Sequence, residues 1–196
     1  MNLRSVFDNP TVFALSQRLI PFTVWVYEDL IERRIVAQRG AKVLDVGCGV
    51  GAHRRFFPGT EYTGIDVNPD YIERATRQYG SGFKTMDATR LEFDDASFDV
   101  SFCVAAFHHL DDAQAASVIR ELYRVVRPGG TVHVVDPVIP VAPRAFVKRW
   151  VFANDRGRHQ RTEEQMRELA TSVAPIARSE RVTGRLHDVL YLRLDR

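Results

Sequence analysis

The residues best suited to chemistry lie in one stretch, Val43-Leu44-Asp45-Val46-Gly47-Cys48-Gly49-Val50-Gly51. An apolar run too short for a helix leads directly into a loop with three glycines among five residues. Glycine is needed where the backbone turns tightly or approaches a ligand closely. The stretch therefore predicts a buried strand that opens into a ligand-binding loop.

Two classes of nucleoside ligand are compatible with this loop. Residues 47–52 match the dinucleotide pattern G-x-G-x-x-A, and Asp66 lies about 20 residues further on, where an acid can hold a ribose. Asp45 favours a ligand with a cationic end, because a carboxylate two residues before the first glycine does not suit a pyrophosphate. A second acid, Asp87, also favours it. A nicotinamide-dependent oxidoreductase remains the alternative.

Strand and helix patterns alternate around these residues. Apolar periodicity predicts helices, and short β-branched runs predict strands. Pro21 divides the first helical stretch, and Asp111 with Gln114 forms a capping box for a later one. The alternation predicts an α/β fold with a mostly parallel sheet. The expected helices are 11–38, 69–79 and 111–126, and the expected strands are 42–46, 62–66, 82–86, 98–104 and 131–136.

The last sixty residues differ in pattern. Prolines 137, 140 and 143 interrupt regular structure, and a capping box of Thr162 and Gln165 opens a helix to about Ala170. Two apolar runs around Gly184 predict a closing antiparallel hairpin. We interpret residues 1–196 as a single domain that consists of a helical lid (1–40), a cofactor-binding core (41–136), a substrate-side insertion (137–170) and closing strands (171–196).

At several of these positions together, the sequence resembles the class I S-adenosylmethionine-dependent methyltransferases, especially their small-molecule branch. The matching motifs occur in the family's order within residues 41–136: 43–51, 64–67, 86–88, 98–100 and 127–130. The resemblance implies a Rossmann-like, doubly wound, mostly parallel seven-stranded sheet with a C-terminal antiparallel hairpin and helices on both faces. It also implies S-adenosylmethionine as cofactor, S-adenosylhomocysteine as product, and methyl transfer to a small molecule.

The resemblance assigns a role to each cofactor-binding candidate. The loop from Asp45 through Gly47, Cys48 and Gly49 to Gly51 would wrap the amino-acid part of the cofactor, with Asp45 near its cationic end. Past that loop, Asp66 would accept from both ribose hydroxyls, Val67 would pack on adenine, Asp87 and Ala88 would contact the adenine edge, and Val104 would lie beneath the cofactor. The rival from another class is a protein of the same fold that binds S-adenosylmethionine but regulates a partner or catalyses another step.

Two histidines are the candidates for acid–base chemistry. His108 and His109 follow the fourth strand, where open α/β sheets bind ligands, and imidazole is suited to take a proton from a hydroxyl near neutral pH. The competing interpretation is that one histidine packs beside the cofactor and the other faces outward. No metal site is expected, because Asp111 is already explained as a helix cap.

The acceptor must be selected by the segments that cover the strand ends. These are the N-terminal helices, with Phe7, Phe13, Trp25 and Tyr27, and the segment after Pro137. Residues 144–161 combine aromatic and basic side chains, which suits an anionic or lipid-like acceptor or a peripheral contact with a membrane surface. Nucleic acid is not expected, because the Asn/Asp-Pro-Pro-aromatic motif typical of base methylation is missing after the fourth strand.

Composition bounds the remaining choices. The chain has 196 residues, of which 45% are hydrophobic and 27% charged, values typical of one globular domain. Cys48 and Cys103 lack metal or redox spacing, which favours free thiols in a reducing compartment. The N-terminus lacks a signal-peptide pattern, and charges interrupt the apolar stretch 11–31. We therefore expect the cytoplasm, with the oligomeric state left open.

Overall fold

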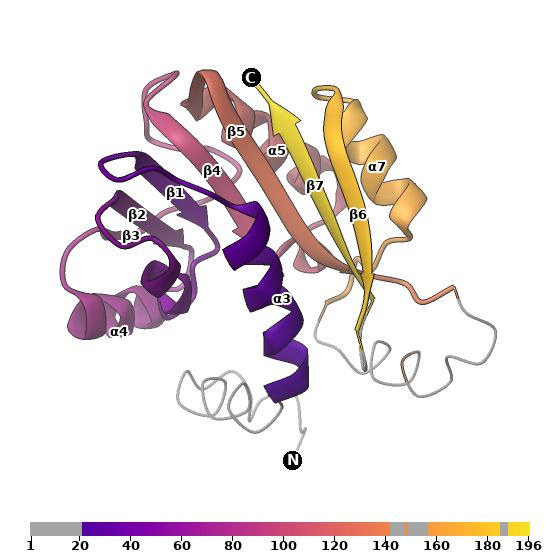
Figure 1. Cartoon of the computed structure of the whole chain (residues 1–196), viewed down its shortest axis with the longest axis horizontal. Coiled ribbons are helices and arrows are strands. Elements are labelled where there is room, and N and C mark those ends of the chain that lie inside the picture. The colour runs from indigo at the N-terminus through magenta and orange to yellow at the C-terminus, as the bar shows by residue number, and fades with distance from the viewer. Residues whose placement is uncertain (1–20, 142–147, 149–156, 185–187) are drawn as a thin grey trace.

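The structure, a computed structural model, describes residues 21–141, 148, 157–184 and 188–196. Its centre is a seven-stranded sheet in the order β3-β2-β1-β4-β5-β7-β6 (Figure 1). Strands β1 to β5 run parallel, and β7 pairs antiparallel with both β5 and β6. The strands are β1 Lys42–Val46, β2 Glu61–Asp66, β3 Phe83–Thr85, β4 Phe98–Val104, β5 Val126–Val138, β6 Ile176–Thr183 and β7 Asp188–Asp195. The predicted fold class and closing hairpin are confirmed.

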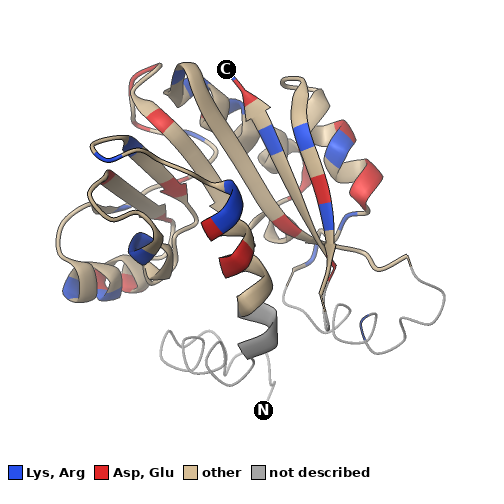
Figure 2. Cartoon of the chain, in the orientation of Figure 1, with Lys and Arg blue, Asp and Glu red and all other residues tan. Residues whose placement is uncertain are grey.

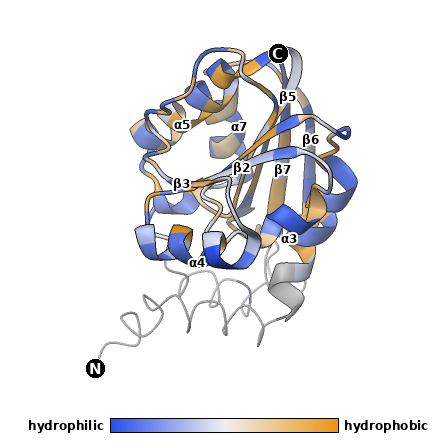
Figure 3. Cartoon of the chain, turned by 90° about the vertical axis from the view of Figure 1, so that its left-hand side faces the viewer, coloured by the Kyte–Doolittle hydropathy of each residue, from blue (hydrophilic) through white to orange (hydrophobic). Residues whose placement is uncertain are grey.

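Helices cover both faces of the sheet (Figure 3). Helices α5 (Asp112–Val125) and α7 (Glu163–Thr171) pack on one face, whereas α3 (Pro21–Arg34) packs on the other. Helix α4 (Pro69–Tyr79) follows β2, and charged residues of both signs are mixed along α4 and α7 (Figure 2). Two short 3-10 helices, η1 (Ala52–Phe56) and η2 (Phe107–His109), follow β1 and β4.

Both predicted capping boxes are present. The Asp111 side chain accepts from the amide of Gln114 at 2.8 Å and begins α5, and Thr162 accepts from the amide of Gln165 at 3.2 Å and begins α7. Each reciprocal bond satisfies two helix donors that otherwise have no partner. These short-range signals could be predicted from sequence because they depend on residues three positions apart.

The segment after α5 differs from the sequence prediction. The sequence predicts a strand over 131–136, but β5 already begins at Val126 and so includes residues 127–130. Phe98 pairs with Val126 and Val100 with Thr131, so the four residues form an irregularity inside the strand. Arg127 holds it by donating to Asp99, a contact between residues far apart in sequence.

The parallel strands end at a common carboxyl edge, which lies at the bottom of Figure 1. Asp66 ends β2 and Val104 ends β4 there, and the pairing of Val138 with Asp188 brings the hairpin to the same edge. Ligands of open α/β sheets bind at this edge. No helix among the described residues is long and apolar enough to cross a bilayer.

Candidate functional site

The glycine loop lies directly after β1. The amides of Gly47 and Cys48 both donate to the carbonyl of Ile65, at 2.8 and 2.9 Å, which ties the loop to β2. Gly49 has a φ of +53°, and a Cβ there would meet no atom within 4 Å, so open space lies over it. Gly51 has a φ of +79°, and a Cβ there would come within 2.8 Å of the Phe83 ring. The loop is thus packed at its base and open at its turn.

Asp45 is a fully buried carboxylate whose two oxygens differ. Its Oδ2 accepts from the Tyr62 hydroxyl at 2.5 Å and lies 3.0 Å from Nδ1 of His53. Its Oδ1 is buried and has no hydrogen-bond partner in the described part of the chain. Burial and the charge of Asp45 raise the pKa of Tyr62, so the hydroxyl stays protonated and donates. A buried charged oxygen without a partner is costly unless a ligand satisfies it.

Asp66 closes the other side of the loop. Its carboxylate accepts from the amides of Gly49 at 3.0 Å and Asn68 at 2.9 Å. Burial raises the pKa of Asp66, and these two amide bonds oppose that rise. The next residue, Val67, is 72% exposed, which is unusual for a large apolar side chain at a strand end. A carboxylate beside an exposed apolar surface suits a ribose and its base.

The remaining cofactor candidates fall into exposed and buried groups. The amide of Met86 donates to the Asp66 carbonyl at 3.0 Å, which brings Asp87 and Ala88 to the same strand end. Asp87 is exposed and accepts from the amide and hydroxyl of Thr89, which lower its pKa. Val104 and Cys48 are buried. Burial, together with the charges of Asp45 and Asp66, raises the pKa of the Cys48 thiol, so it stays neutral.

The two histidines after β4 have different environments. His108 is buried, and its Nδ1 lies 3.1 Å from Oδ1 of the buried Asp136. Burial raises the pKa of Asp136, while His108 lowers it. His109 is exposed, and its ring centroid lies 4.1 Å from that of His108. One ring is therefore held in the fold and the other faces outward; a role for either in catalysis stays a prediction.

Residues 157–161 pack on the histidine turn, which is the segment 107–110 after β4. The Arg161 guanidinium is buried and donates to the carbonyls of Phe107 at 2.9 Å and Leu110 at 2.7 Å. The amide of His159 donates to the carbonyl of His108 at 3.0 Å. A Cβ on Gly157 would come within 2.3 Å of the His108 ring, so only glycine fits there. Residues 157–161 thus fix the turn at the carboxyl edge.

Backbone strain occurs at the same place. Ala105, directly after β4, has a φ of +54°, and its amide donates to the Val135 carbonyl at 2.8 Å. A left-handed conformation costs a non-glycine residue about 1 kcal/mol or more, and such residues are frequent at functional sites. The sharp turn directs the chain from β4 into η2 at the carboxyl edge.

Several residues of the site could not be singled out from sequence. Tyr62 and His53 reach Asp45 from β2 and η1, and Arg161 reaches Leu110 in the histidine turn from 51 positions away. Asp136 is the exception, because an acid near the end of a predicted parallel strand is expected at the carboxyl edge. The partners of the other three depend on packing that no local pattern encodes.

Parts of the predicted acceptor region lie outside the described residues. This applies to Phe7, Phe13 and residues 144–161 except 148 and 157–161, a range that is the proposed membrane-contact segment. Trp25 is 63% exposed on α3. The residues that the structure describes hold no group of three or more His, Cys, Asp or Glu side chains placed to bind a metal ion.

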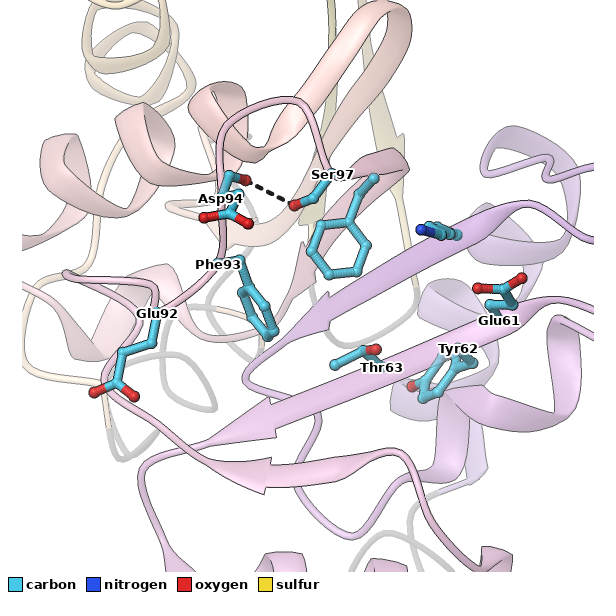
Figure 4. Close-up of a pocket in the computed structure, with 9 residues that line it drawn as sticks. Glu61, Tyr62, Thr63, Glu92, Phe93, Asp94 and Ser97 are labelled. Atoms are coloured by element: carbon cyan, nitrogen blue, oxygen red, sulfur yellow. Dashed lines mark hydrogen bonds between the residues drawn. The ribbon is translucent and has the colours of Figure 1, made fainter.

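A cavity of about 430 Å³ lies elsewhere, beside the segment that joins β3 to β4 (Figure 4). Lys42 and Glu61, the first residues of β1 and β2, contribute to its wall, so it lies toward the amino edge of the sheet. The rest of its lining is Tyr62, Thr63, Glu92, Phe93, Asp94, Ser97 and Phe98. None of the predicted site residues lines it, and we assign the functional site to the carboxyl edge instead.

The chain is similar to known methyltransferases in sequence and in fold. Residues 44–134 match the family described as methyltransferase domain. The chain is 41% identical over 104 residues to 2-methyl-6-phytyl-1,4-hydroquinone methyltransferase from Synechocystis sp., which covers 50% of this chain and 32% of that protein. It is 31% identical over 145 residues to a sterol 24-C-methyltransferase from Aspergillus fumigatus, and the match covers 69% of this chain and 36% of that protein. The chain therefore spans about a third of the length of these curated relatives.

The fold is shared with a solved structure. A SAM-dependent methyltransferase from Methanosarcina mazei superposes with a TM-score of 0.67 at 24% identity, covering 81% of this chain and 94% of that one. At this identity the likeness concerns the fold.

Proposed function

We propose, on the premise that this chain belongs to the class I S-adenosylmethionine-dependent methyltransferases, that it transfers a methyl group from S-adenosylmethionine to a small-molecule acceptor. One observation carries the proposal. The buried Asp45 keeps an unpartnered oxygen beside a glycine turn with open space over Gly49, and Asp66 closes the other side. A cationic, nucleoside-bearing ligand satisfies all three features.

The residues present fit this cofactor part by part. Asp45 Oδ1 would take the ammonium of the amino-acid part, and Gly49 would allow the ligand to approach the backbone closely. Asp66 keeps lone pairs for the ribose hydroxyls, because each carboxylate oxygen can accept more than one bond. Val67 would cover one face of adenine, with Asp87 and Ala88 toward its edge and Val104 below. Cys48 would contribute through its backbone, because its thiol is buried and neutral.

The bound cofactor would supply a methyl group already activated on a sulfonium. The chain's own residues then have to position the acceptor and exclude water, which are strong contributions when little acid–base chemistry is needed. The histidine turn forms the mouth where an acceptor would lie. Nδ1 of His108 is directed at Asp136, so proton transfer by His108 would use Nε2, and His109 is the exposed alternative.

The acceptor that we favour is lipid-like and ring-bearing. The curated relatives are named for a phytylated hydroquinone and a sterol, both largely apolar. The N-terminal end of α3, with the exposed Trp25, projects past the carboxyl edge, and Val141 after β5 is 65% exposed (Figure 1). These apolar side chains support an apolar acceptor delivered to that edge. We keep the cytoplasm as the proposed compartment.

The test is a transfer assay with S-adenosylmethionine labelled in its methyl group. The purified protein would be incubated with separate panels of prenylated hydroquinones, sterols and simple phenols, and Asp66→Ala would serve as the matched control. We expect label in an extracted product in equal amount to S-adenosylhomocysteine. Binding of S-adenosylmethionine without transfer to any panel would favour the regulatory alternative, and NADH oxidation would favour the oxidoreductase.

A further inference from the structure

We propose that His53 and Tyr62 are positioning residues for the cofactor: they hold Asp45 so that its free oxygen, Oδ1, receives the ligand's ammonium group. This inference rests on the proposed function and extends it to two residues that no sequence motif marks. It concerns binding of the amino-acid part of the ligand, not the transfer step.

The inference rests on the different contacts of the two carboxylate oxygens of Asp45. Tyr62 reaches Asp45 from the neighbouring strand β2 and His53 reaches it from η1, yet both contact Oδ2. Asp45 is completely buried, and Oδ1 has no partner among the described residues. Two donors that served only to bury a carboxylate would be expected to satisfy both oxygens. Their convergence on one oxygen fixes the plane of the carboxylate and leaves the other for a ligand.

The groups around Asp45 favour a cationic ligand. Tyr62 and Cys48 are neutral, because burial and the charge of Asp45 raise the pKa of each. The nearby Arg54 lies over the Tyr62 ring, 5.3 Å from its centroid, and donates to the Phe57 carbonyl. Within the described ranges, no Lys or Arg forms an ion pair with Asp45. Among the described residues Asp45 has its ion-pair contact with His53 through Oδ2, so an ammonium at Oδ1 would supply the partner that this oxygen lacks.

His53 can be replaced without emptying the core. Its side chain is 19% exposed, and its ring has a tilted contact with Phe102 at 6.0 Å between centroids. Asparagine can present an N–H near the position of Nδ1, whereas alanine cannot. Tyr62→Phe removes only the hydroxyl. Arg55, which is exposed and lies two residues after His53 in η1, offers a matched control, since its ion pair is with Glu28.

The experiment compares two ligands that differ in the group at issue. S-adenosylhomocysteine carries the ammonium, whereas 5′-methylthioadenosine lacks the whole amino-acid part. Calorimetric titrations would measure both affinities for wild type, His53→Ala, His53→Asn, Tyr62→Phe and Arg55→Ala, with thermal unfolding to check folding. We expect His53→Ala and Tyr62→Phe to weaken S-adenosylhomocysteine about 10-fold and methylthioadenosine less than about twofold. His53→Asn should recover most of the loss, and Arg55→Ala should change neither affinity.

The contrary outcomes are distinct. Equal loss for both ligands in folded variants would mean that His53 and Tyr62 only support the loop, and unchanged affinities would mean that they do not position Asp45. Each of these results overturns the inference while cofactor binding stands. If wild type binds neither ligand, the proposed function is overturned and the inference with it. Should Tyr62→Phe fail to fold, the pair of His53 variants decides.

Discussion

The proposed cofactor side and the proposed acceptor side of the carboxyl edge use buried polar groups in opposite ways. On the cofactor side, Asp45 is buried with one oxygen unpartnered, and the turn at Gly49 faces open space. On the acceptor side, the buried Asp136 bonds to His108 and to the amide of Phe107, and Arg161 bonds to two carbonyls. The first region has a buried polar atom without a hydrogen-bond partner, whereas the buried polar groups of the second are hydrogen-bonded within the protein.

This difference indicates how the two proposed ligands would be recognised. The cofactor region can offer fixed polar contacts to one invariant molecule, which is what a site for a common cofactor requires. The described acceptor region offers a fixed turn and exposed apolar side chains such as Trp25, so shape and apolar contact would select the acceptor. The comparison predicts that substitutions on the acceptor side will leave cofactor affinity unchanged, whereas substitutions on the cofactor side will lower it.

The largest effect is expected at Arg161. Arg161→Met removes the donors to the Phe107 and Leu110 carbonyls, and we expect a loss of about 3 kcal/mol in unfolding free energy. Denaturant titration measures this loss. Arg167→Met, which removes a more exposed ion pair with Glu163, should cost under about 0.5 kcal/mol. Affinity for S-adenosylhomocysteine should stay within about twofold in the folded Arg161 variant. A larger loss of this affinity would contradict the separation of the two regions.

The next effect concerns cofactor affinity. Asp66→Ala should weaken binding of S-adenosylhomocysteine by about 2 kcal/mol, because the ribose loses a carboxylate acceptor and the amide of Gly49 loses its partner. Calorimetry measures the affinity. Asp111→Ala, a loss of a helix cap on the acceptor side, is the matched control and should leave affinity unchanged. An unaltered affinity in Asp66→Ala would remove this residue from the site.

A smaller effect is expected from acid. Burial lowers the pKa of His133 to about 3, and its ring bonds to the Tyr191 hydroxyl at 3.0 Å. The unfolded chain takes up this proton near pH 6.5 and the folded chain does not, so stability falls as pH drops below that value. From pH 7 to 5.5 this costs about 1 kcal/mol. His133→Gln should remove that part of the slope, and parallel pH curves for both proteins would contradict it.

The smallest effect on folding and cofactor binding is expected at His109. Because its side chain is exposed, His109→Ala should change unfolding free energy by less than about 0.5 kcal/mol and leave cofactor affinity unchanged. Turnover is the informative measurement. A fall of about 100-fold or more would identify His109 as the base, and full turnover in both His109→Ala and a folded His108→Ala would reject histidine base catalysis.

The parts of the fold that follow local or periodic rules could be predicted from sequence. The capping boxes at Asp111 and Thr162, helix 69–79 and the hairpin around Gly184 depend on residues close in the chain, and the structure confirms them. Strand 82–86 proved shorter, as β3 holds three residues at the edge of the sheet. The irregularity at 127–130 was missed because Asp99, its partner, is distant in sequence.

The site divides in the same way. Asp45, Gly49 and Asp66 were singled out because glycine spacing and acids after apolar runs are visible in one dimension, and the structure brings all three together. The partners of Asp45 and the position of Arg161 follow from tertiary packing. The burial of one histidine and exposure of the other also depend on residues 157–161, which no pattern near His108 reveals.

The most direct test of the central claim is calorimetric titration of the whole chain with S-adenosylmethionine, S-adenosylhomocysteine and NADH, each alone. We predict micromolar binding of both adenosyl ligands, no heat from NADH, and the loss described for Asp66→Ala. Binding of NADH, or no response to either adenosyl ligand, would contradict the assignment of the carboxyl-edge loop as a site for S-adenosylmethionine.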